Sequence, residues 1–127
     1  MESKITVVLC EPGKRAQVVE IENTLEAMQR TVGGLIEAIY TDHDYVCLIV
    51  NEDGKLLDLP MNRAIYVGDT IADIIMGSFF VAAFDDDGNF MSLNDDQIKR
   101  YEKQYRWPEK FTFLGNRIIS EEVHVNA

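Results

Sequence analysis

The sequence predicts an α+β fold, a single domain that is mainly antiparallel sheet with about two short helices packed on it. Three observations predict this class. Short runs rich in β-branched residues recur along the chain, turn-forming residues separate most of them, and only two stretches combine a helix cap with helical periodicity. The 127 residues fit one α+β domain, which we expect to span residues 1–107, with residues 108–127 as a C-terminal extension.

The N-terminal segment predicts a hairpin. Residues 4–13, KITVVLCEPG, are a β-branched run that ends in a Pro-Gly turn signal. Residues 15–22, RAQVVEIE, have the composition of a returning strand. We therefore expect these two segments to pair.

The first helix is expected directly after this hairpin. Asn23 is a good N-cap residue, and Glu26 three residues later is the return half of a capping box. Gly33 would end the helix in the C′ position. Three apolar side chains fall on one helical face: Leu25, Met28 and Val32. A helix this short is not stable alone, so it is expected to pack on a sheet.

The middle of the chain predicts three more strands. Residues 35–41 and 44–50 are apolar runs joined by a short polar link, which is typical of an antiparallel pair. Asp53-Gly54 is a strong hairpin signal. Residues 55–60, KLLDLP, are therefore predicted to return as a strand that ends at its proline.

A short helical turn is predicted after residues 62–67, which lead into a glycine. Asp69 or Thr70 is expected to cap this turn, which would run through Ile74 and end at Gly77. The next strand follows at residues 78–84.

The C-terminal third predicts a second hairpin, a helix and a tail. An Asp-Gly turn at residues 85–89 returns the chain to residues 90–93. Asn94 is expected to cap the last helix, with Gln97 at N3. Within the extension, strand-like pieces flank Gly115. They would complete a sheet or dock on another subunit, so a homo-oligomer is one of the arrangements that we consider.

The charge and composition exclude some classes of function. The formal net charge of −10 argues against a general nucleic-acid binder, which needs clustered Lys and Arg. Solubility is the commonest reason for such a charge; the alternatives are a basic protein partner and imitation of DNA, for which this chain has too large a core. No apolar run approaches the ~20 residues of a membrane span. The N-terminus lacks the pattern of a signal peptide, so we expect a cytoplasmic protein.

The sequence carries no catalytic or metal signature, and we expect no cofactor. His43 lies between two aspartates in a predicted loop, where a solvated turn residue is the simplest interpretation, and His124 lies near the C-terminus. Cys10 and Cys47 lie in apolar runs, which favours buried thiols over a disulfide. Residues 85–96 partly match a calcium-loop template, but its sixth position is Phe where Gly is needed. A hairpin turn followed by a helix cap explains them better.

Three polar residues flank the predicted strand at residues 55–60. Arg63 offers a planar fork suited to carboxylate or phosphate. Considered by residue type alone, local roles are favoured: Asn51 starts a turn, and Arg63 pairs with one of the 22 acidic residues. Asn62 is the third of these residues.

Longer segments resemble the family named domain of unknown function 3846. They are LEAMQRTVGGLIEAIY, NEDGKLLDLPMNRAIY and IIMGSFFVAAFDDDGNFMSLNDDQIKRY, and the resemblance covers about residues 4–105. It implies a setting in Gram-positive bacteria, their phages and mobile elements, and it brings no established activity. It also implies a shared pattern made up of Gly33, Gly34, Glu37, Asn51, Glu52, Gly54, Pro60, Asn62 and Arg63.

The pattern shifts the interpretation towards a binding site. Glycine and proline meet backbone demands, whereas Glu37, Asn62 and Arg63 are harder to explain by turns. We expect Arg63 to bind an anionic group, with an aromatic ring such as Tyr66 or Phe80 stacking on a base. The expected ligand-binding residues are Glu37, Asn51, Asn62, Arg63 and Tyr66.

Two functional hypotheses follow, and neither is an enzyme. The first is a small non-catalytic binding protein of phage type, a counter-defence protein that sequesters a small anionic, nucleotide-like ligand. The alternative is an acidic protein-interaction module that docks on a basic host protein and inhibits it. A hydrolase that uses Glu37 or an Asp cluster lacks support, because no two carboxylates have a fixed separation on one element.

Overall fold

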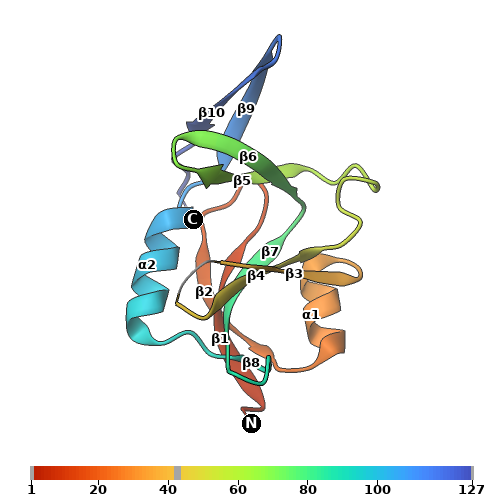
Figure 1. Cartoon of the computed structure of the whole chain (residues 1–127), viewed down its shortest axis with the longest axis vertical. Coiled ribbons are helices and arrows are strands. Elements are labelled where there is room, and N and C mark those ends of the chain that lie inside the picture. The colour runs from red at the N-terminus through yellow and green to blue at the C-terminus, as the bar shows by residue number, and fades with distance from the viewer. Residues whose placement is uncertain (1, 42–43, 127) are drawn as a thin grey trace.

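The computed structural model describes residues 2–41 and 44–126. Its centre is an antiparallel sheet in which the strands lie in the order β2-β1-β7-β4-β3, with β8 paired to β7 (Figure 1). The strands are β1 (Lys4–Cys10), β2 (Gln17–Glu22), β3 (Ile36–Tyr40), β4 (Val46–Asn51), β7 (Phe79–Phe84) and β8 (Phe90–Met91). Together with helices α1 (Leu25–Val32) and α2 (Asp95–Tyr105), this sheet confirms the predicted α+β class.

The sheet buries both of its faces. Strands β4 and β7 lie inside it, and they are apolar almost throughout because neither face reaches water. Successive side chains point to opposite faces, so Leu48 packs with Tyr105 of α2 in one core, while Ile49 packs with Met28 of α1 in the other. The two helices therefore cover opposite faces, as Figure 1 shows.

The N-cap of α1 is Thr24, which corrects the prediction of Asn23. The Thr24 hydroxyl accepts a hydrogen bond from the backbone of Ala27. Asn23 instead donates through its side chain to the carbonyls of Glu2 and Phe90, which ties the start of the helix to the sheet. Asparagine and threonine both cap helices well, so the sequence did not show which of Asn23 and Thr24 is the N-cap. Gly33 ends the helix in the left-handed conformation, as predicted.

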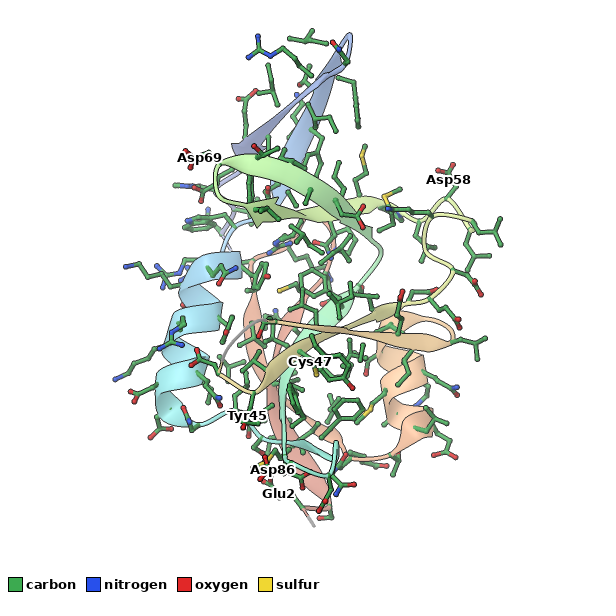
Figure 2. All side chains as sticks on the ribbon, in the orientation of Figure 1. Glu2, Tyr45, Cys47, Asp58, Asp69 and Asp86 are labelled. Carbon is green, nitrogen blue, oxygen red and sulfur yellow. The ribbon has the colours of Figure 1, made fainter. Side chains whose placement is uncertain are left out.

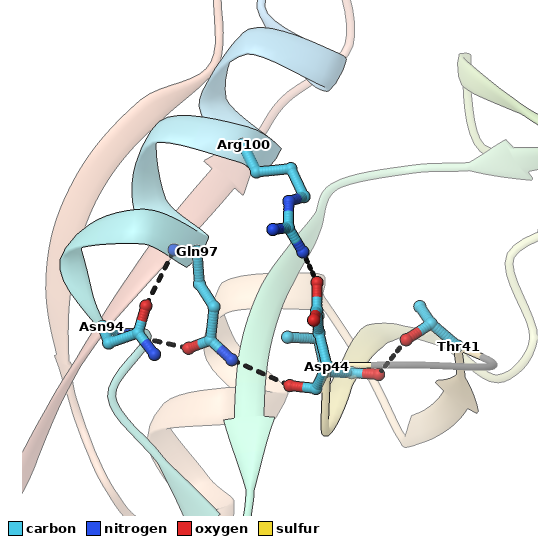
Figure 3. Close-up of polar contacts among 6 residues, drawn as sticks. Thr41, Asp44, Asn94, Gln97 and Arg100 are labelled. Carbon is cyan, nitrogen blue, oxygen red and sulfur yellow. Dashed lines mark hydrogen bonds and ion pairs between the residues drawn. The ribbon is translucent and has the colours of Figure 1, made fainter.

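The predicted capping box of α2 is confirmed. The Asn94 side chain accepts from the backbone of Gln97, and the Gln97 side chain accepts from the backbone of Asn94. Gln97 also donates to the Asp44 carbonyl at 2.8 Å, and Arg100 forms an ion pair with the Asp44 carboxylate (Figure 3). These contacts fix the N-terminal half of α2 against the start of β4.

Residues 70–76 form a strand, which corrects the predicted helical turn. Strands β5 (Met61–Val67) and β6 (Thr70–Met76) are an antiparallel hairpin. Of the two residues predicted as a cap, Asp69 lies in its turn and Thr70 begins β6. Turns and helix caps favour the same polar residues. Ile75 of β6 joins the core on the α2 side, so this hairpin covers part of the same face of the sheet.

Residues 52–58 form consecutive turns, and the strand predicted at residues 55–60 is wrong. The backbone N–H of Leu57 donates to the Asp53 carbonyl, and Asp58 has a φ of 53°. Leu56 is 84% exposed and Leu57 is 57% exposed. Leu56 and Leu57, which suggested a strand, therefore face solvent on a projecting loop, with Asp58 at its outer side (Figure 2).

The C-terminal extension contains a second separate hairpin. Strands β9 (Glu109–Leu114) and β10 (Arg117–Glu122) pair antiparallel around Gly115, where strand-like pieces were predicted. The hairpin projects beyond β5 and β6 at one end of the molecule (Figure 1). The described residues include no helix with the length and apolar character needed to cross a membrane.

The chain around this hairpin is anchored through Trp107. The ring of His124 stacks on the indole with their centroids 4.2 Å apart. The guanidinium of Arg15 lies 5.0 Å from the same indole, which is the geometry of a cation–π contact. His43 lies outside the described residues, so its predicted turn position has no structural description.

Candidate functional site

Arg63 on β5 is the centre of a closed polar cluster. The residue is 0% exposed. Its Nε and Nη2 donate to the Tyr105 carbonyl at 3.2 and 2.8 Å. Nη2 also donates to the Lys14 carbonyl at 2.8 Å. Nη1 donates to the Glu11 carbonyl at 3.1 Å and to Asn62 Oδ1 at 2.7 Å. An arginine has five N–H donors, so these contacts use its whole donor capacity.

Asn62 completes the cluster from the adjacent position. Its Nδ2 donates to the carbonyls of Cys10 and Gly77 at 2.9 and 2.8 Å, while its Oδ1 accepts from Arg63. Asn62 is therefore also buried with its hydrogen-bonding groups occupied. Together the two side chains join β5 to the end of β1, the segment before β7 and the end of α2.

Asn62 and Arg63, which were predicted as ligand-binding residues, are both buried, and their side-chain hydrogen bonds are all made within the chain. Burial lowers the pKa of Arg63, and the opposing influence of Cys10 and Glu109 is smaller. The guanidinium faces carbonyl oxygens, whose dipoles compensate its charge. An anionic ligand could reach Arg63 only if these bonds broke. Phe80, which was considered for stacking, is also fully buried, in the core on the α1 side.

Asn51 has a second structural role, at the end of α1. Its Nδ2 donates to the Val32 carbonyl at 3.1 Å, and its Oδ1 accepts from the backbone of Asp53 at 2.8 Å. One side chain therefore satisfies a helix-end carbonyl and closes the following turn. Gly34 makes room for it, because a Cβ there would lie 2.9 Å from Asn51 Nδ2.

Glu37 and Asn51 line a hollow of about 130 Å³ between the β3–β4 pair and β6. Its apolar wall comes from Ile39, Val50, Ile74, Ile75 and Met76. Three carboxylates line it, those of Glu37, Glu52 and Asp73, and Lys55 supplies its one ammonium group among the described residues. Lys55 forms an ion pair with Asp73.

The carboxylates of Glu37 and Glu52 have no hydrogen-bond or ion-pair partner among residues 2–41 and 44–126. Both are exposed, and they lie on neighbouring parts of the hollow because the backbone of Glu52 donates to the Leu35 carbonyl, two residues before Glu37. Carboxylates accept hydrogen bonds from ammonium and guanidinium groups. The hollow therefore presents unoccupied acceptors beside an apolar wall.

Exposed leucines lie next to residues of this hollow along the chain or in the sheet. Leu56 and Leu57 follow its rim residues Gly54 and Lys55 directly, and Leu35, bonded to the backbone of Glu52, is also more than half exposed. Exposed apolar side chains beside charged groups are the composition of many protein-interaction surfaces. We name the hollow together with Leu35, Leu56 and Leu57 the acidic docking surface.

Tyr66 lies elsewhere. It is exposed on β5, and its hydroxyl donates to Glu109 Oε1 at 3.2 Å. The other oxygen of Glu109 accepts from the backbone of Ala64, which ties β9 to β5. The five predicted site residues thus fall into three places: Glu37 and Asn51 at the hollow, Asn62 and Arg63 inside the molecule, and Tyr66 beside the C-terminal hairpin.

Both cysteines are buried, as predicted. Burial raises the pKa of Cys10 and of Cys47 to about 12; Figure 2 shows Cys47 inside the sheet. A thiol with this pKa remains protonated near neutral pH and is a poor nucleophile. Among the described residues, no group of three or more His, Cys, Asp or Glu side chains could hold a metal ion.

The stretch at residues 85–96 has the predicted turn and cap. The Asp85 carboxylate accepts from the backbones of Asp87 and Asn89, which closes the hairpin turn. These bonds hold the pKa of Asp85 below its usual value. Asn94 then caps α2. Asp85 and Asn89, two of the residues that partly matched a calcium loop, therefore have local structural partners.

One protein family matches most of the chain. The match is to the family described as domain of unknown function (DUF3846), over residues 5–106. The chain belongs to this family. No curated protein and no solved structure matches the chain. The family match covers the sheet, both helices and the hollow, and it ends before β9.

The structure explains most of the shared pattern in terms of the fold. Gly33 ends α1, Gly34 and Asn51 pack together, and Asn62 and Arg63 form the buried cluster. A Cβ at Gly54 would lie 2.6 Å from the Met76 carbonyl, and the Pro60 carbonyl accepts from Gly77. The pattern residues that remain are Glu37 and Glu52, which line the hollow. Sequence reasoning named Glu37 but missed Glu52, although both belong to the pattern.

Proposed function

We propose that this chain is a non-catalytic, cytoplasmic binding module that docks a basic segment of a partner protein on its acidic docking surface. The unpaired carboxylates of Glu37 and Glu52 carry the proposal. Every other polar side chain of the shared pattern has a partner inside the fold, so these two are left for a partner outside it. In the phage or mobile-element setting that the family resemblance implies, the partner would be a host protein.

The electrostatics of the hollow support a cationic group. Three carboxylates face one ammonium group that is already paired, and the whole chain carries a formal charge of −10. A lysine or arginine side chain could lay its methylene groups along the apolar wall and place its charged end between the carboxylates. The exposed leucines would add apolar contact around this point.

The same features weaken the case for sequestration of a small anionic ligand. The arginine expected to hold such a ligand uses all of its donors inside the fold. A phosphate in the hollow would be repelled by the carboxylates of Glu37 and Glu52, which carry charge of the same sign. Sequestration remains a proposal, and it has a test of its own.

The docking proposal is tested by nuclear magnetic resonance titration with small probes. We expect a lysine-containing and an arginine-containing tripeptide with blocked ends to shift the backbone resonances of Glu37, Glu52 and Asp73. The shifts should weaken as ionic strength rises, because the contacts are ionic and partly exposed. Adenosine monophosphate is the anionic probe, and shifts at the hollow with it alone would contradict the proposal.

A matched pair of variants isolates the two carboxylates. Glu37→Gln with Glu52→Gln should abolish the peptide-induced shifts at the hollow. Glu20→Gln with Glu22→Gln changes the net charge equally on β2, at the other edge of the sheet, and should preserve them. If both double variants weaken binding equally, only the overall charge matters and the hollow is not the site.

Native mass spectrometry of the protein purified from cells tests the sequestration proposal. An added mass in the nucleotide range that dissociates intact on denaturation would favour a sequestering pocket over the docking surface. A bound protein that is lost in the Glu37→Gln, Glu52→Gln variant, but kept in the β2 control, would favour docking.

A further inference from the structure

The C-terminal hairpin of β9 and β10 is incompletely covered. Strand β10 pairs only with β9 among the described strands, and a two-stranded sheet in water is at best marginally stable by itself. The contacts to the rest of the chain come mainly from β9, through Glu109. Phe113 is 55% exposed, and Leu114 and Ile118 are exposed too. An unpaired strand edge next to exposed apolar side chains is a template for another strand.

The backbone groups on the open edge of β10 can be assigned. Val123 donates its N–H to the Pro108 carbonyl, which continues the β9–β10 register by one residue. Successive residues of a strand direct their backbone groups to opposite sides. The odd-numbered residues of β10 therefore face β9, and Ile118, Ser120 and Glu122 direct their N–H and C=O groups away from it.

The open edge borders free space. A hollow of about 470 Å³ lies between β10 and the turn of the β5–β6 hairpin, and its walls include Asp69, Thr70, Arg117 and Ser120. The lining of this hollow also includes Ile118, so it adjoins both residues near the centre of the edge whose backbone groups face away from β9.

The sequence of β10 is complementary to itself. When two copies of one strand pair antiparallel about a two-fold axis, residues opposite each other must point to the same face of the sheet. The axis therefore lies midway between the two copies of one residue. An axis at Ile119 places Arg117 opposite Glu121 of the partner subunit, and it places Ile118 opposite Ser120 of the partner subunit. Ile118 and Ser120 are the residues whose backbone groups face the open edge. An axis at Ser120 would instead place Ile119 opposite Glu121 of the partner subunit, without a charge pair.

We propose that two copies of this chain associate through β10, in antiparallel register about a two-fold axis at Ile119. The pairing turns two separate hairpins into one four-stranded sheet. It places two Arg–Glu pairs across the seam, and cross-strand pairs of opposite charge stabilise antiparallel sheets. It also extends the apolar strip of Ile118 and Phe113, which are opposite each other within one hairpin. This surface is separate from Glu37 and Glu52.

A cysteine at the axis tests the register directly. Ile119 faces β9, so across the seam it forms a pair without hydrogen bonds, in which the Cα atoms lie about 4.5 Å apart. This distance suits a disulfide. We expect Ile119→Cys to give a disulfide-linked dimer under mild oxidation, with twice the 14.5 kDa mass of the chain. Cys10 and Cys47 are buried and do not compete.

Ile118→Cys is the matched control. In the proposed register the Cα atoms of the two introduced cysteines would be roughly 8 Å apart, given the strand rise and spacing, which is too far for a disulfide. Ile118 is nevertheless the more exposed residue, so random collisions would link it more readily than Ile119. Equal linking of both variants, or none of Ile119→Cys, would overturn the proposal.

A charge exchange tests the same contact without covalent trapping. A strand seam buries less surface than an obligate dimer, so we expect the dimer fraction to rise with concentration in light scattering. Arg117→Glu should lower the dimer fraction by bringing two carboxylates together, and Glu121→Arg should lower it by bringing two cations together. The double variant Arg117→Glu, Glu121→Arg should restore it. A monomeric wild-type protein, or no restoration in the double variant, would overturn the proposal.

Discussion

The Arg63 cluster and the Glu37–Glu52 hollow both contain residues of the pattern that the family resemblance implies, yet one is closed and the other is open. At Arg63 every donor meets an acceptor within the chain. At the hollow two carboxylates have no partner in the described chain. The count of satisfied donors and acceptors therefore separates Arg63, which is bonded within the fold, from Glu37 and Glu52, whose carboxylates are not bonded within the described part of it.

The largest expected effect is that of Arg63→Ala, which tests the closed region. Removing the guanidinium leaves buried carbonyls without donors, and each such group costs about 1–3 kcal/mol. We expect the free energy of unfolding to fall by at least about 3 kcal/mol in urea denaturation. Arg30→Ala on the exposed side of α1 is the control and should cost less than about 1 kcal/mol. A stable Arg63→Ala protein would mean that the cluster is dispensable to the fold.

The second effect concerns Gly54, which belongs to the lining of the open region. An added Cβ would approach the Met76 carbonyl to 2.6 Å, and this backbone atom cannot move without shifting β6. We expect Gly54→Ala to cost about 1–3 kcal/mol of unfolding free energy. The variant should also disturb the resonances of the hollow, which Gly54 lines. A normal melting temperature with an unchanged hollow would show that the loop adapts freely.

The third effect is a loss of stability at alkaline pH, which the buried thiols should cause. The pKa of Cys10 and of Cys47 is about 12 in the folded protein, against 9.0 for an ordinary thiol. The contribution of the two thiols to the free energy of unfolding is fully present below pH 9 and is lost as the pH rises from 9 towards 12. In this range the thiols ionise in the unfolded chain but stay protonated in the folded protein. One pH unit above the ordinary pKa, each thiol should cost roughly 1 kcal/mol.

Urea denaturation across this pH range measures the loss. Burial also raises the pKa of Tyr105, so this residue adds to the loss at the upper end. A Cys47→Ala variant should show a shallower decline than the wild type, although its stability at neutral pH will be lower. An identical slope in both proteins would exclude the Cys47 thiol as a cause.

The smallest expected effect on stability is that of Glu37→Gln with Glu52→Gln, which tests the open region. Neither carboxylate has a partner to lose in the described chain, so we expect the unfolding free energy to change by no more than about 0.5 kcal/mol. The same variant should lose binding of the cationic peptides. A marked loss of stability would make these residues structural and would place the hollow in the same class as the Arg63 cluster.

The local elements were largely predictable because their signals are local. The capping box of Asn94 and Gln97, the helix stop at Gly33 and the Asp-Gly turn before β8 each depend on residues a few positions apart. The errors occurred where one signal fits two structures. Asp69 and Thr70 suit a helix cap and a hairpin turn equally, and the apolar run after Gly54 resembles a strand although Leu56 and Leu57 are exposed.

The candidate site was predictable only in part. Glu37 was predicted as a site residue and does line the hollow, whereas Arg63 was expected at a ligand and lies inside the fold. Asp73 lines the hollow from β6, and Lys55 lines it from the projecting loop. The sequence prediction did not place these two residues next to each other. Their neighbourhood depends on β6 being a strand.

The sequence by itself determined the fold class, the helix ends and most hairpins, since short-range hydrogen bonding and apolar alternation specify them. It also singled out a set of polar residues, including Glu37, Asn51, Asn62 and Arg63. Only the tertiary structure decided which partners they have, because the backbone carbonyl partners of Arg63 lie 42 to 52 positions away in the chain. Burial and donor satisfaction are properties of the assembled molecule. An asparagine or arginine therefore looks the same in the sequence whether its side chain is bonded inside the fold or exposed at the surface. The packing around it decides which of the two occurs.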